Sequence, residues 1–230
     1  MTATYFITGT DTGCGKTTVT AALARHWAAH GIRVACFKPL ASGCRRLNGR
    51  LVNDDALELM AAMNVSLRYE QVNPIALEAP VAPHLEAERA GIGIDPDAIV
   101  SEINSIPADL KLVEGVGGWQ VPIDATRFLS EFPRRLGCPV VLVVGMRLGC
   151  LNHALLSVRA ISDDGLRLAG WVANFLDPQF DQADANLAYL RQAIDAPLLA
   201  TMNGEAELDM RLDPLSGAAP AAAANLPGRL

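Results

Sequence analysis

Short, largely apolar runs separated by amphipathic segments dominate the chain. These runs cover residues 5–7, 32–37, 110–113, 139–145, 168–173 and 197–200. Between the first two runs, Val19, Leu23 and Trp27 recur at the spacing of a helix over residues 16–30. Apolar runs without strict alternation are typical of parallel strands that are covered on both faces. The pattern therefore predicts the α/β class, with a single doubly wound, mostly parallel sheet and helices on both faces.

Weaker signals place the other elements. In chain order they are a polar loop at 45–53, a helix at 56–60, a short strand at 72–75, helices at 85–90, 95–103, 150–162 and 181–194, and a last strand at 197–200. Asp54 is positioned to cap the helix that starts at residue 56. Residues 215–230 are rich in Ala, Pro and Gly, which predicts a loosely packed tail. We expect one domain over residues 1–230.

Composition narrows the classes of function. Half of the 230 residues are hydrophobic, and the net charge of −6 argues against a nucleic-acid partner. No apolar run reaches 18 residues and the first strand begins at once, so we expect neither a membrane span nor a signal peptide, and a cytoplasmic location. The five cysteines show no CxxC spacing, which favours reduced, buried thiols over zinc ligands or disulfides.

A glycine-rich segment at residues 9–18 joins the first strand to the first helix. Glycines let backbone N–H groups turn toward phosphate oxygens, and the helix start adds partial positive charge. Lys16 can reach the β- and γ-phosphates, and the Thr17 hydroxyl can bind Mg²⁺. Five residues separate Gly9 from Gly15 instead of the usual four, so a glycine-rich turn with an incidental lysine is the alternative. The flanking strand and helix favour nucleotide binding and a fold of the P-loop NTPase type; the expected nucleotide contacts in this loop are Gly13, Cys14, Gly15, Lys16, Thr17 and Thr18.

Chemically active side chains follow the ends of two other predicted strands. Because ligands gather at the carboxyl ends of parallel strands, Lys38 and Ser42 after the second strand are candidates for the site. A solvated loop charge is the alternative for Lys38. Glu114 ends an apolar strand, where a carboxylate can hold Mg²⁺ directly or through water, and Gly117 lies in the loop beyond it. If the Asp54 carboxylate caps the helix, the Asp55 carboxylate beside it can face the metal.

Taken together and in this order, the motifs resemble those of the dethiobiotin synthetase family over nearly the whole chain. They are Gly9-Thr10-Asp11-Thr12 with Gly15-Lys16-Thr17, Lys38-Pro39 with Ala41-Ser42-Gly43, Asp55-Ala56, Val72-Asn73-Pro74, Pro83-His84, Val113-Glu114-Gly115 with Gly117-Gly118-Trp119, Val144-Gly145 with Leu148-Gly149-Cys150, Asn152-His153-Ala154, and Gly170-Trp171-Val172-Ala173-Asn174. The resemblance implies a ligase of biotin biosynthesis that converts 7,8-diaminopelargonic acid, CO₂ and ATP to dethiobiotin, ADP and phosphate. It also implies a carbamate and a carbamic–phosphoric anhydride as intermediates, Mg²⁺ as cofactor, and a homodimer with the substrate across the subunit interface.

The resemblance also implies roles for residues. Lys16 and Lys38 offset the charge of the carbamate and phosphates, while Thr12 and Ser42 orient the carbamate or the amine. Mg²⁺ lies on Thr17, Asp55 and Glu114. The substrate carboxylate meets a helix start of the other subunit, at Gly149, Cys150, Leu151 and Asn152. Asn174 and Asn203 contact the nucleotide base, with a strand-end turn as the alternative role of Asn174.

The chain departs from the family pattern at three places. Gly13 and Cys14 replace a common acidic and a common aliphatic residue, and Arg147 replaces a common lysine. Residues 200–203 read Ala-Thr-Met-Asn where Gly-x-Ile-Pro is usual, which predicts looser selection of the base. Two other functions fit the nucleotide motif: a related P-loop amide ligase, which usually carries a glutaminase domain, and a partition-type nucleotide switch ATPase, which needs a basic surface.

Overall fold

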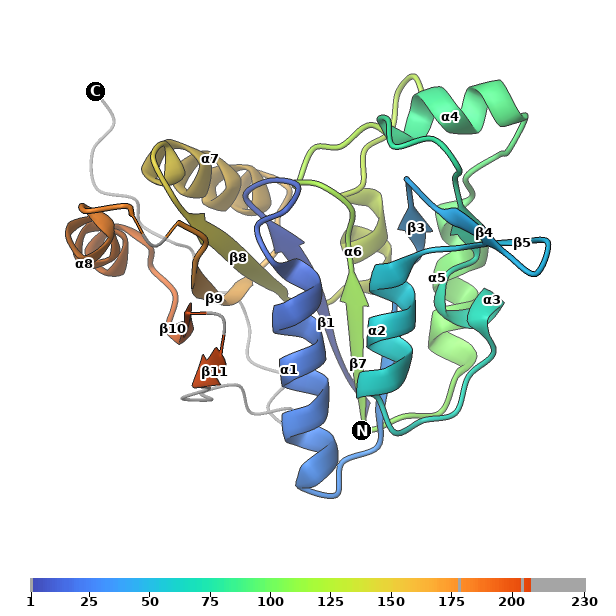
Figure 1. Ribbon diagram of the computed structural model, residues 1–230, viewed down its shortest axis with the longest axis horizontal. Helices are drawn as coiled ribbons and strands as arrows, with labels where there is room; N and C mark the ends of the chain where they lie inside the picture. The colour runs from blue at the N-terminus through green and yellow to red at the C-terminus, as the bar shows by residue number, and fades with distance from the viewer. Residues whose placement is uncertain (1, 178, 204, 208–230) are drawn as a thin grey trace.

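The computed structural model describes residues 2–177, 179–203 and 205–207, and shows a twisted sheet between two layers of helices (Figure 1). The sheet order is β11-β10-β9-β8-β1-β7-β2, and every pair except β10–β11 is parallel. The strands are β1 (Ala3–Gly9), β2 (Val34–Phe37), β7 (Leu110–Glu114), β8 (Val140–Met146), β9 (Leu168–Phe175), β10 (Leu198–Asn203) and β11 (Glu205–Glu207). The predicted tail at 215–230 lies outside the described residues.

Alternating residues of the central strands pack into different layers, as the two-residue period of a strand requires. On β1, Ile7 belongs to the core layer that also contains Val19 and Leu23 of α1 (Lys16–Ala29) and buried residues of α2 (Asp54–Ala62). Its neighbour Phe6 packs on the opposite face with Phe132. That face carries α4 (Pro83–Ala90), α5 (Pro96–Ser105), α6 (Glu131–Leu136), α7 (Cys150–Asp163) and α8 (Ala183–Ala193). The doubly wound sheet with helices on both faces is therefore confirmed.

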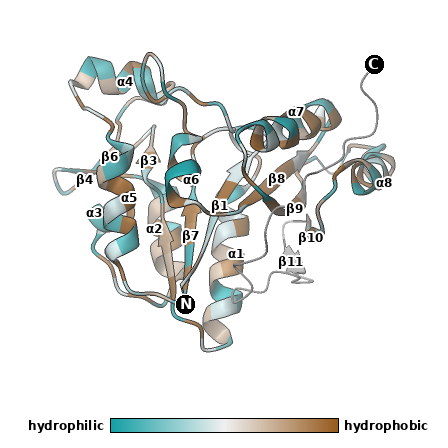
Figure 2. Cartoon of the chain, turned by 180° about the vertical axis from the view of Figure 1, so that it is seen from behind, coloured by the Kyte–Doolittle hydropathy of each residue, from teal (hydrophilic) through white to brown (hydrophobic). Residues whose placement is uncertain are grey.

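The apolar strands are buried as predicted. All seven residues of β8 are buried, and Figure 2 shows this strand as hydrophobic along its length. Lys111 interrupts the apolar run of β7, and its ammonium donates to the carbonyls of Ile103 and Asn104 at the end of α5. All five cysteines are free and buried, as expected. Among the described residues, no helix is long and apolar enough to cross a membrane.

Four local predictions are wrong. The predicted loop at 45–53 is a hairpin of β4 (Arg45–Leu47) and β5 (Arg50–Val52), whose turn places Asn48 and Gly49 at positive φ. The predicted strand at 72–75 is split between α3 (Tyr69–Val72) and β6 (Ile75–Ala76), which pairs with β3 (Leu40–Ala41). β10 is followed by β11 and is not the last strand, and α6 was not predicted.

The fourth error concerns the start of α2. Asn53, not Asp54, is the N-cap, because the Asn53 side chain accepts a hydrogen bond from the Ala56 amide at 3.2 Å. Asp54 instead forms an exposed ion pair with Arg45 of the hairpin. The helix therefore begins one residue earlier than the cap prediction implied, and Asp55 in its first turn is free to face the sheet end.

Candidate active site

The loop between β1 and α1 has the backbone that a phosphate cradle needs. Gly13 and Gly15 adopt φ of 72° and 90°, in the left-handed region that glycine tolerates best. Gly15 immediately precedes α1, so the loop ends at a helix N-terminus. A Cβ atom at Gly15 would lie 2.0 Å from the Asn174 Nδ2 atom. Glycine at position 15 is thus required both by its conformation and by a neighbouring side chain.

Lys16 is buried at the start of α1 and is held by neutral groups. Its Nζ donates to the Asp11 carbonyl at 2.9 Å and to the Gly117 carbonyl at 2.7 Å. Burial lowers the pKa of the Lys16 ammonium from its ordinary value. The two carbonyls come from the phosphate loop and from the loop after β7, so the lysine joins these two segments. The same ammonium lines the cleft and can exchange these carbonyls for phosphate oxygens.

Lys38, at the end of β2, lies between two carboxylates. Its Nζ is 2.8 Å from Asp55 Oδ2 and 2.5 Å from Glu114 Oε1. The side chains of Lys38 and Glu114 are only 3% and 0% exposed, so Lys38 is not a solvated loop charge. Burial works against the charged form of Lys38, but attraction to the two carboxylates outweighs burial and raises the pKa of the ammonium. Burial likewise opposes ionisation of Asp55, yet Lys38 dominates and lowers the pKa of that carboxyl.

The predicted metal ligands lie close together. The Thr17 hydroxyl donates to Glu114 Oε1 at 2.8 Å, and Lys38 links Glu114 to Asp55. The second Glu114 oxygen, Oε2, is buried and lacks a hydrogen-bond partner within the described part of the chain. An unpartnered buried carboxylate oxygen beside a hydroxyl and a second carboxylate fits Mg²⁺, which prefers oxygen ligands.

The protein supplies only part of such a coordination shell. Residues 2–177, 179–203 and 205–207 contain no group of three His, Cys, Asp or Glu side chains that could hold a metal. Mg²⁺ usually keeps several waters and takes phosphate oxygens as further ligands. The set of Thr17, Asp55 and Glu114 therefore suits a metal that is bound together with a nucleotide.

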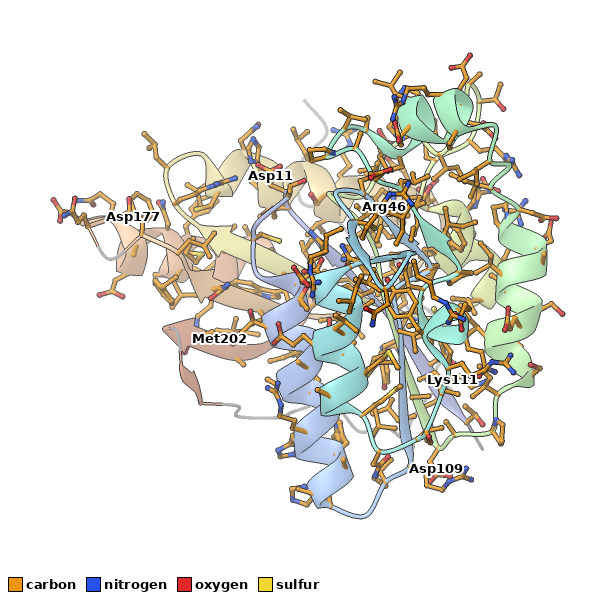
Figure 3. All side chains as sticks on the ribbon, turned by 45° about the vertical axis from the view of Figure 1, so that its right-hand side comes forward. Asp11, Arg46, Asp109, Lys111, Asp177 and Met202 are labelled. Carbon is orange, nitrogen blue, oxygen red and sulfur yellow. The ribbon has the colours of Figure 1, made fainter. Side chains whose placement is uncertain are left out.

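A cleft of about 770 Å³ opens over these residues. Ser42 lines it, and the Ser42 Oγ atom is buried without a hydrogen-bond partner among residues whose positions are described. Thr12 is exposed at the rim, on the loop that carries Asp11 in Figure 3. The structure thus gathers the predicted residues Thr12, Gly13, Gly15, Lys16, Thr17, Thr18, Lys38, Ser42, Asp55 and Gly117 around one cavity, with Glu114 beneath Lys38.

The predicted carboxylate-binding residues are not part of this cleft. Gly149, with φ of 94°, caps α7, and Cys150, Leu151 and Asn152 form its first turn. In the described chain, none of these four residues lines the cavity. Leu148, just before them, has 89% of its surface exposed, which is unusual for a leucine. This helix start therefore lies outside the lining of the chain's own cleft.

The two residues predicted to contact the base, Asn174 and Asn203, lie near the ends of neighbouring strands. Asn174, the second-last residue of β9, is buried, and its Nδ2 donates to the Cys14 carbonyl at 3.0 Å. Asn174 therefore braces the phosphate loop, and its predicted contact with the nucleotide base stays a prediction. Asn203 ends β10, and its side chain lies outside what the structure describes. The Cys14 side chain is buried, so this residue can contribute to the site through its backbone.

Three polar contacts that position the site were missed from the sequence. Arg147 pairs with Asp11 at 2.5 Å, and the Gly145 amide donates to Thr10 Oγ1 at 3.2 Å, so the end of β8 holds the phosphate loop. The Asn73 side chain donates to the Lys38 carbonyl at 2.6 Å and fixes the end of β2. Arg147 is one of the departures from the family pattern, and Asn73 belongs to one of the family motifs. Their partners, however, are distant in sequence, and no local pattern reveals these contacts.

Comparison with known proteins identifies similar chains. A family model described as "AAA domain" matches residues 3–211. The ATP-dependent dethiobiotin synthetase BioD of Pseudomonas paraeruginosa is 47% identical over 223 residues, which cover 96% of this chain and 93% of that protein. The protein of the same name from Cellvibrio japonicus is 48% identical over 200 residues, which cover 86% of this chain and 88% of that protein.

More distant solved structures share the fold. The septum site-determining protein MinD of Pyrococcus horikoshii, in complex with Mg-ADP, superposes with a TM-score of 0.55 at 20% identity, over 89% of this chain and 82% of that chain. Chloroplast FtsY of Physcomitrella patens gives a TM-score of 0.52 at 19% identity, over 93% of this chain and 63% of that chain. At these identities the likeness concerns the α/β fold alone.

Proposed function

The chain belongs to the dethiobiotin synthetase family, and from this premise we propose that it is an ATP-dependent ligase that forms dethiobiotin in the cytoplasm. Its substrates are 7,8-diaminopelargonic acid, CO₂ and ATP, and its products are dethiobiotin, ADP and phosphate. One amine of the diamine adds CO₂ to give a carbamate. A carbamate oxygen then attacks the γ-phosphorus, and the bond from that phosphorus to the ADP oxygen breaks. The second amine attacks the resulting anhydride carbon, and phosphate leaves as the ring closes.

The observation that carries this proposal is the placement of two ammonium groups at one cleft. Lys16 and Lys38 line the same cavity, Lys16 from the start of α1 and Lys38 from the position after the end of β2. A carbamate that approaches the γ-phosphate brings one negative charge toward several others, so the transition state needs fixed positive charge. Lys16 supplies it on the phosphate side and Lys38 on the carbamate side.

Other residues of the cleft bind and orient. The unpartnered Ser42 hydroxyl and the exposed Thr12 hydroxyl can hydrogen-bond the carbamate or the amine, which holds the reacting atoms in line. Thr17, Asp55 and Glu114 would hold Mg²⁺, which neutralises phosphate charge when bound. The backbone of residues 13–18 would cradle the phosphates.

We propose that the substrate carboxylate is bound by a second copy of the chain. The free N–H groups at the start of α7 suit the carboxylate of a long diamino acid whose amines lie beside Lys38. Because that helix start does not line the chain's own cleft, we propose a homodimer in which it serves the partner's active site.

The test is incorporation of labelled bicarbonate into diaminopelargonate. We expect a labelled, acid-stable ureido product only when ATP, Mg²⁺ and the diamine are all present, since the carbamate alone loses CO₂ in acid. A folded protein that hydrolyses ATP without this product would contradict the assignment. ATP hydrolysis stimulated by a larger acid would instead favour the amide ligase, and hydrolysis that depends on no small substrate would favour a nucleotide switch.

A further inference from the structure

One ammonium group holds all the carboxylates of the proposed metal site. Lys38 Nζ lies 2.8 Å from Asp55 Oδ2, 2.5 Å from Glu114 Oε1 and 3.3 Å from the Gly115 carbonyl. An ammonium group has three N–H donors, so these three oxygens use all of them. The lysine therefore occupies the position of a cation between the two carboxylates.

The formal charges of Asp55, Glu114, Lys38 and the neighbouring Lys16 sum to zero. Asp55 and Glu114 contribute two negative charges and Lys38 one positive charge. The buried Lys16 ammonium is near enough to Lys38 for the two charges to repel. A free Mg²⁺ ion that enters this cluster gains little net attraction and meets two buried cations at short range, where repulsion is weakly screened.

Phosphates change this balance. A nucleotide bound on the loop at residues 9–18 brings several negative charges next to Lys16 and Thr17. These charges can recruit Mg²⁺ and can attract the Lys38 ammonium away from the carboxylates. Lys38 is one of the residues that line the cleft.

We propose that the Lys38 ammonium excludes free Mg²⁺ from the nucleotide-free site, so that the metal enters only together with nucleotide phosphates. The displaced ammonium then turns to the anionic substrate group in the cleft. In this way, nucleotide binding would control where the Lys38 ammonium lies. The inference rests on the proposed metal site and is independent of the reaction that the site performs.

The experiment measures metal binding without turnover. Mn²⁺, a paramagnetic substitute for Mg²⁺, is titrated into the nucleotide-free protein, and free Mn²⁺ is followed by electron paramagnetic resonance. The variants are Lys38→Met, which keeps the length of the side chain but removes its charge, and Lys38→Arg, which keeps the charge. We expect Lys38→Met to bind one Mn²⁺ at least about tenfold more tightly than wild type, because a like charge at contact distance is gone. Lys38→Arg should remain like wild type.

Two controls locate the effect. Adding Glu114→Gln to Lys38→Met should abolish the new site, since Glu114 supplies the carboxylate. Lys111→Met removes another buried lysine that contacts backbone carbonyls rather than carboxylates, and should leave Mn²⁺ binding unchanged. Equal Mn²⁺ affinity in wild type and Lys38→Met overturns the proposal.

Wild type alone provides a second test if Lys38→Met does not fold. Without nucleotide, wild type should bind Mn²⁺ at least about tenfold more weakly than with a non-hydrolysable ATP analogue, because the phosphates supply the missing charge. Tight Mn²⁺ binding by nucleotide-free wild type that is lost in Glu114→Gln overturns the proposal. Neither result depends on whether dethiobiotin is the product, so the proposed function is tested separately by the bicarbonate assay.

Discussion

Lys16 and Lys38 are both buried ammonium groups, but their partners differ. Lys16 donates to the carbonyls of Asp11 and Gly117, which carry no charge, whereas Lys38 contacts two carboxylates. An ammonium group held by neutral carbonyls can turn to an incoming phosphate more readily than one held in a buried ion pair, because breaking the ion pair leaves uncompensated charges. The two lysines therefore differ in how readily each ammonium can turn to a phosphate.

The first residue-scale prediction concerns Lys16. Lys16→Ala should keep the fold and lose phosphoryl transfer by at least about a hundredfold, the scale of removing one fixed charge from a transition state. ADP release and the far-ultraviolet circular dichroism spectrum measure the two properties. Near-normal ADP release by the folded variant would remove Lys16 from the phosphate site.

The second residue-scale prediction concerns the nucleotide base. Asn174 commits its Nδ2 to Cys14, and residues 200–203 lack the proline-containing loop common in the family. Contacts to phosphates are blind to the base, so we expect GTP or CTP to support turnover within about 3 kcal/mol of ATP, the scale of one or two base-edge hydrogen bonds. Measuring kcat/KM for the four ribonucleotides checks this, and a preference for ATP well beyond about a hundredfold (2.7 kcal/mol) would contradict it.

At the scale of elements, the phosphate loop depends on β9, two strands away from β1 in the sheet. Asn174 near the end of β9 bonds to Cys14 and leaves no room for a side chain at Gly15. Arg147 and Gly145, beyond and within β8, hold Asp11 and Thr10 on the other side. The conformation of the loop is therefore set by neighbouring strands as well as by its glycines.

Two glycines at opposite ends of α1 test this dependence. Gly15→Ala should weaken binding of an ATP analogue by at least about tenfold (1.4 kcal/mol), because the new Cβ must displace Asn174 or the loop. The matched control is Gly31→Ala, whose φ of 80° carries the same backbone strain, about 1–2 kcal/mol. Its Cβ would meet nothing within 4 Å in the described structure, so nucleotide affinity should not change. Calorimetry measures affinity, and equal affinities for both variants would argue against the Asn174 contact.

A second element-scale prediction concerns the loop that forms one wall of the cleft. Val121 and Pro122 line the cavity, and Asp124 holds their loop by accepting from the amides of Thr126 and Arg127 and from the Arg127 side chain. The Thr126 amide and the Arg127 guanidinium lower the pKa of Asp124 to about 2 from an ordinary 3.8. A depressed carboxyl pKa stabilises the fold above the unfolded pKa, and this stabilisation is lost as the pH falls toward the folded pKa.

Asp124→Asn should accordingly lower Tm by a constant amount at pH 5–7. The difference from wild type should shrink as the pH falls from about 4 toward about 2, where Asp124 becomes protonated in both states. Thermal unfolding at a series of pH values measures it. A Tm difference that does not change with pH would show that the charge of Asp124 is not what stabilises the loop.

At the scale of the whole molecule, the cleft and the start of α7 are separate surfaces of one chain. The proposed homodimer brings these two surfaces together. Among the described residues of the single chain, Leu148 next to the start of α7 is the most exposed large apolar side chain. Leu148→Asp should leave the monomer folded, because the residue makes little contact within the chain, but should weaken the dimer and reduce activity together.

Sedimentation velocity and the bicarbonate assay, run at the same protein concentrations, measure both effects. Leu47→Asp on the β4–β5 hairpin is a matched control, since Leu47 is also exposed but lies on another element and should change neither. A fully active wild-type monomer at assay concentration would disprove the shared site.

The sequence by itself determined the class of the fold, the order of its main strands and helices, and the phosphate loop. These depend on local signals: hydrophobic period, strand length, and glycines beside a lysine at a helix start. Short elements were predicted less well, because the hairpin of β4 and β5 and the cap at Asn53 depend on single residues with several compatible conformations.

Only the tertiary structure decided what the site residues contact. Lys38 meets Glu114 from 76 positions away, Arg147 meets Asp11 across 136, and Asn174 meets Cys14 across 160. The sheet order that brings these strand ends together is a property of the packed chain, and no local pattern encodes it. The sequence therefore named the candidates for the site, while the fold decided that Lys38 holds both carboxylates and that Asn174 braces the loop, since such pairs form only when distant strands are side by side.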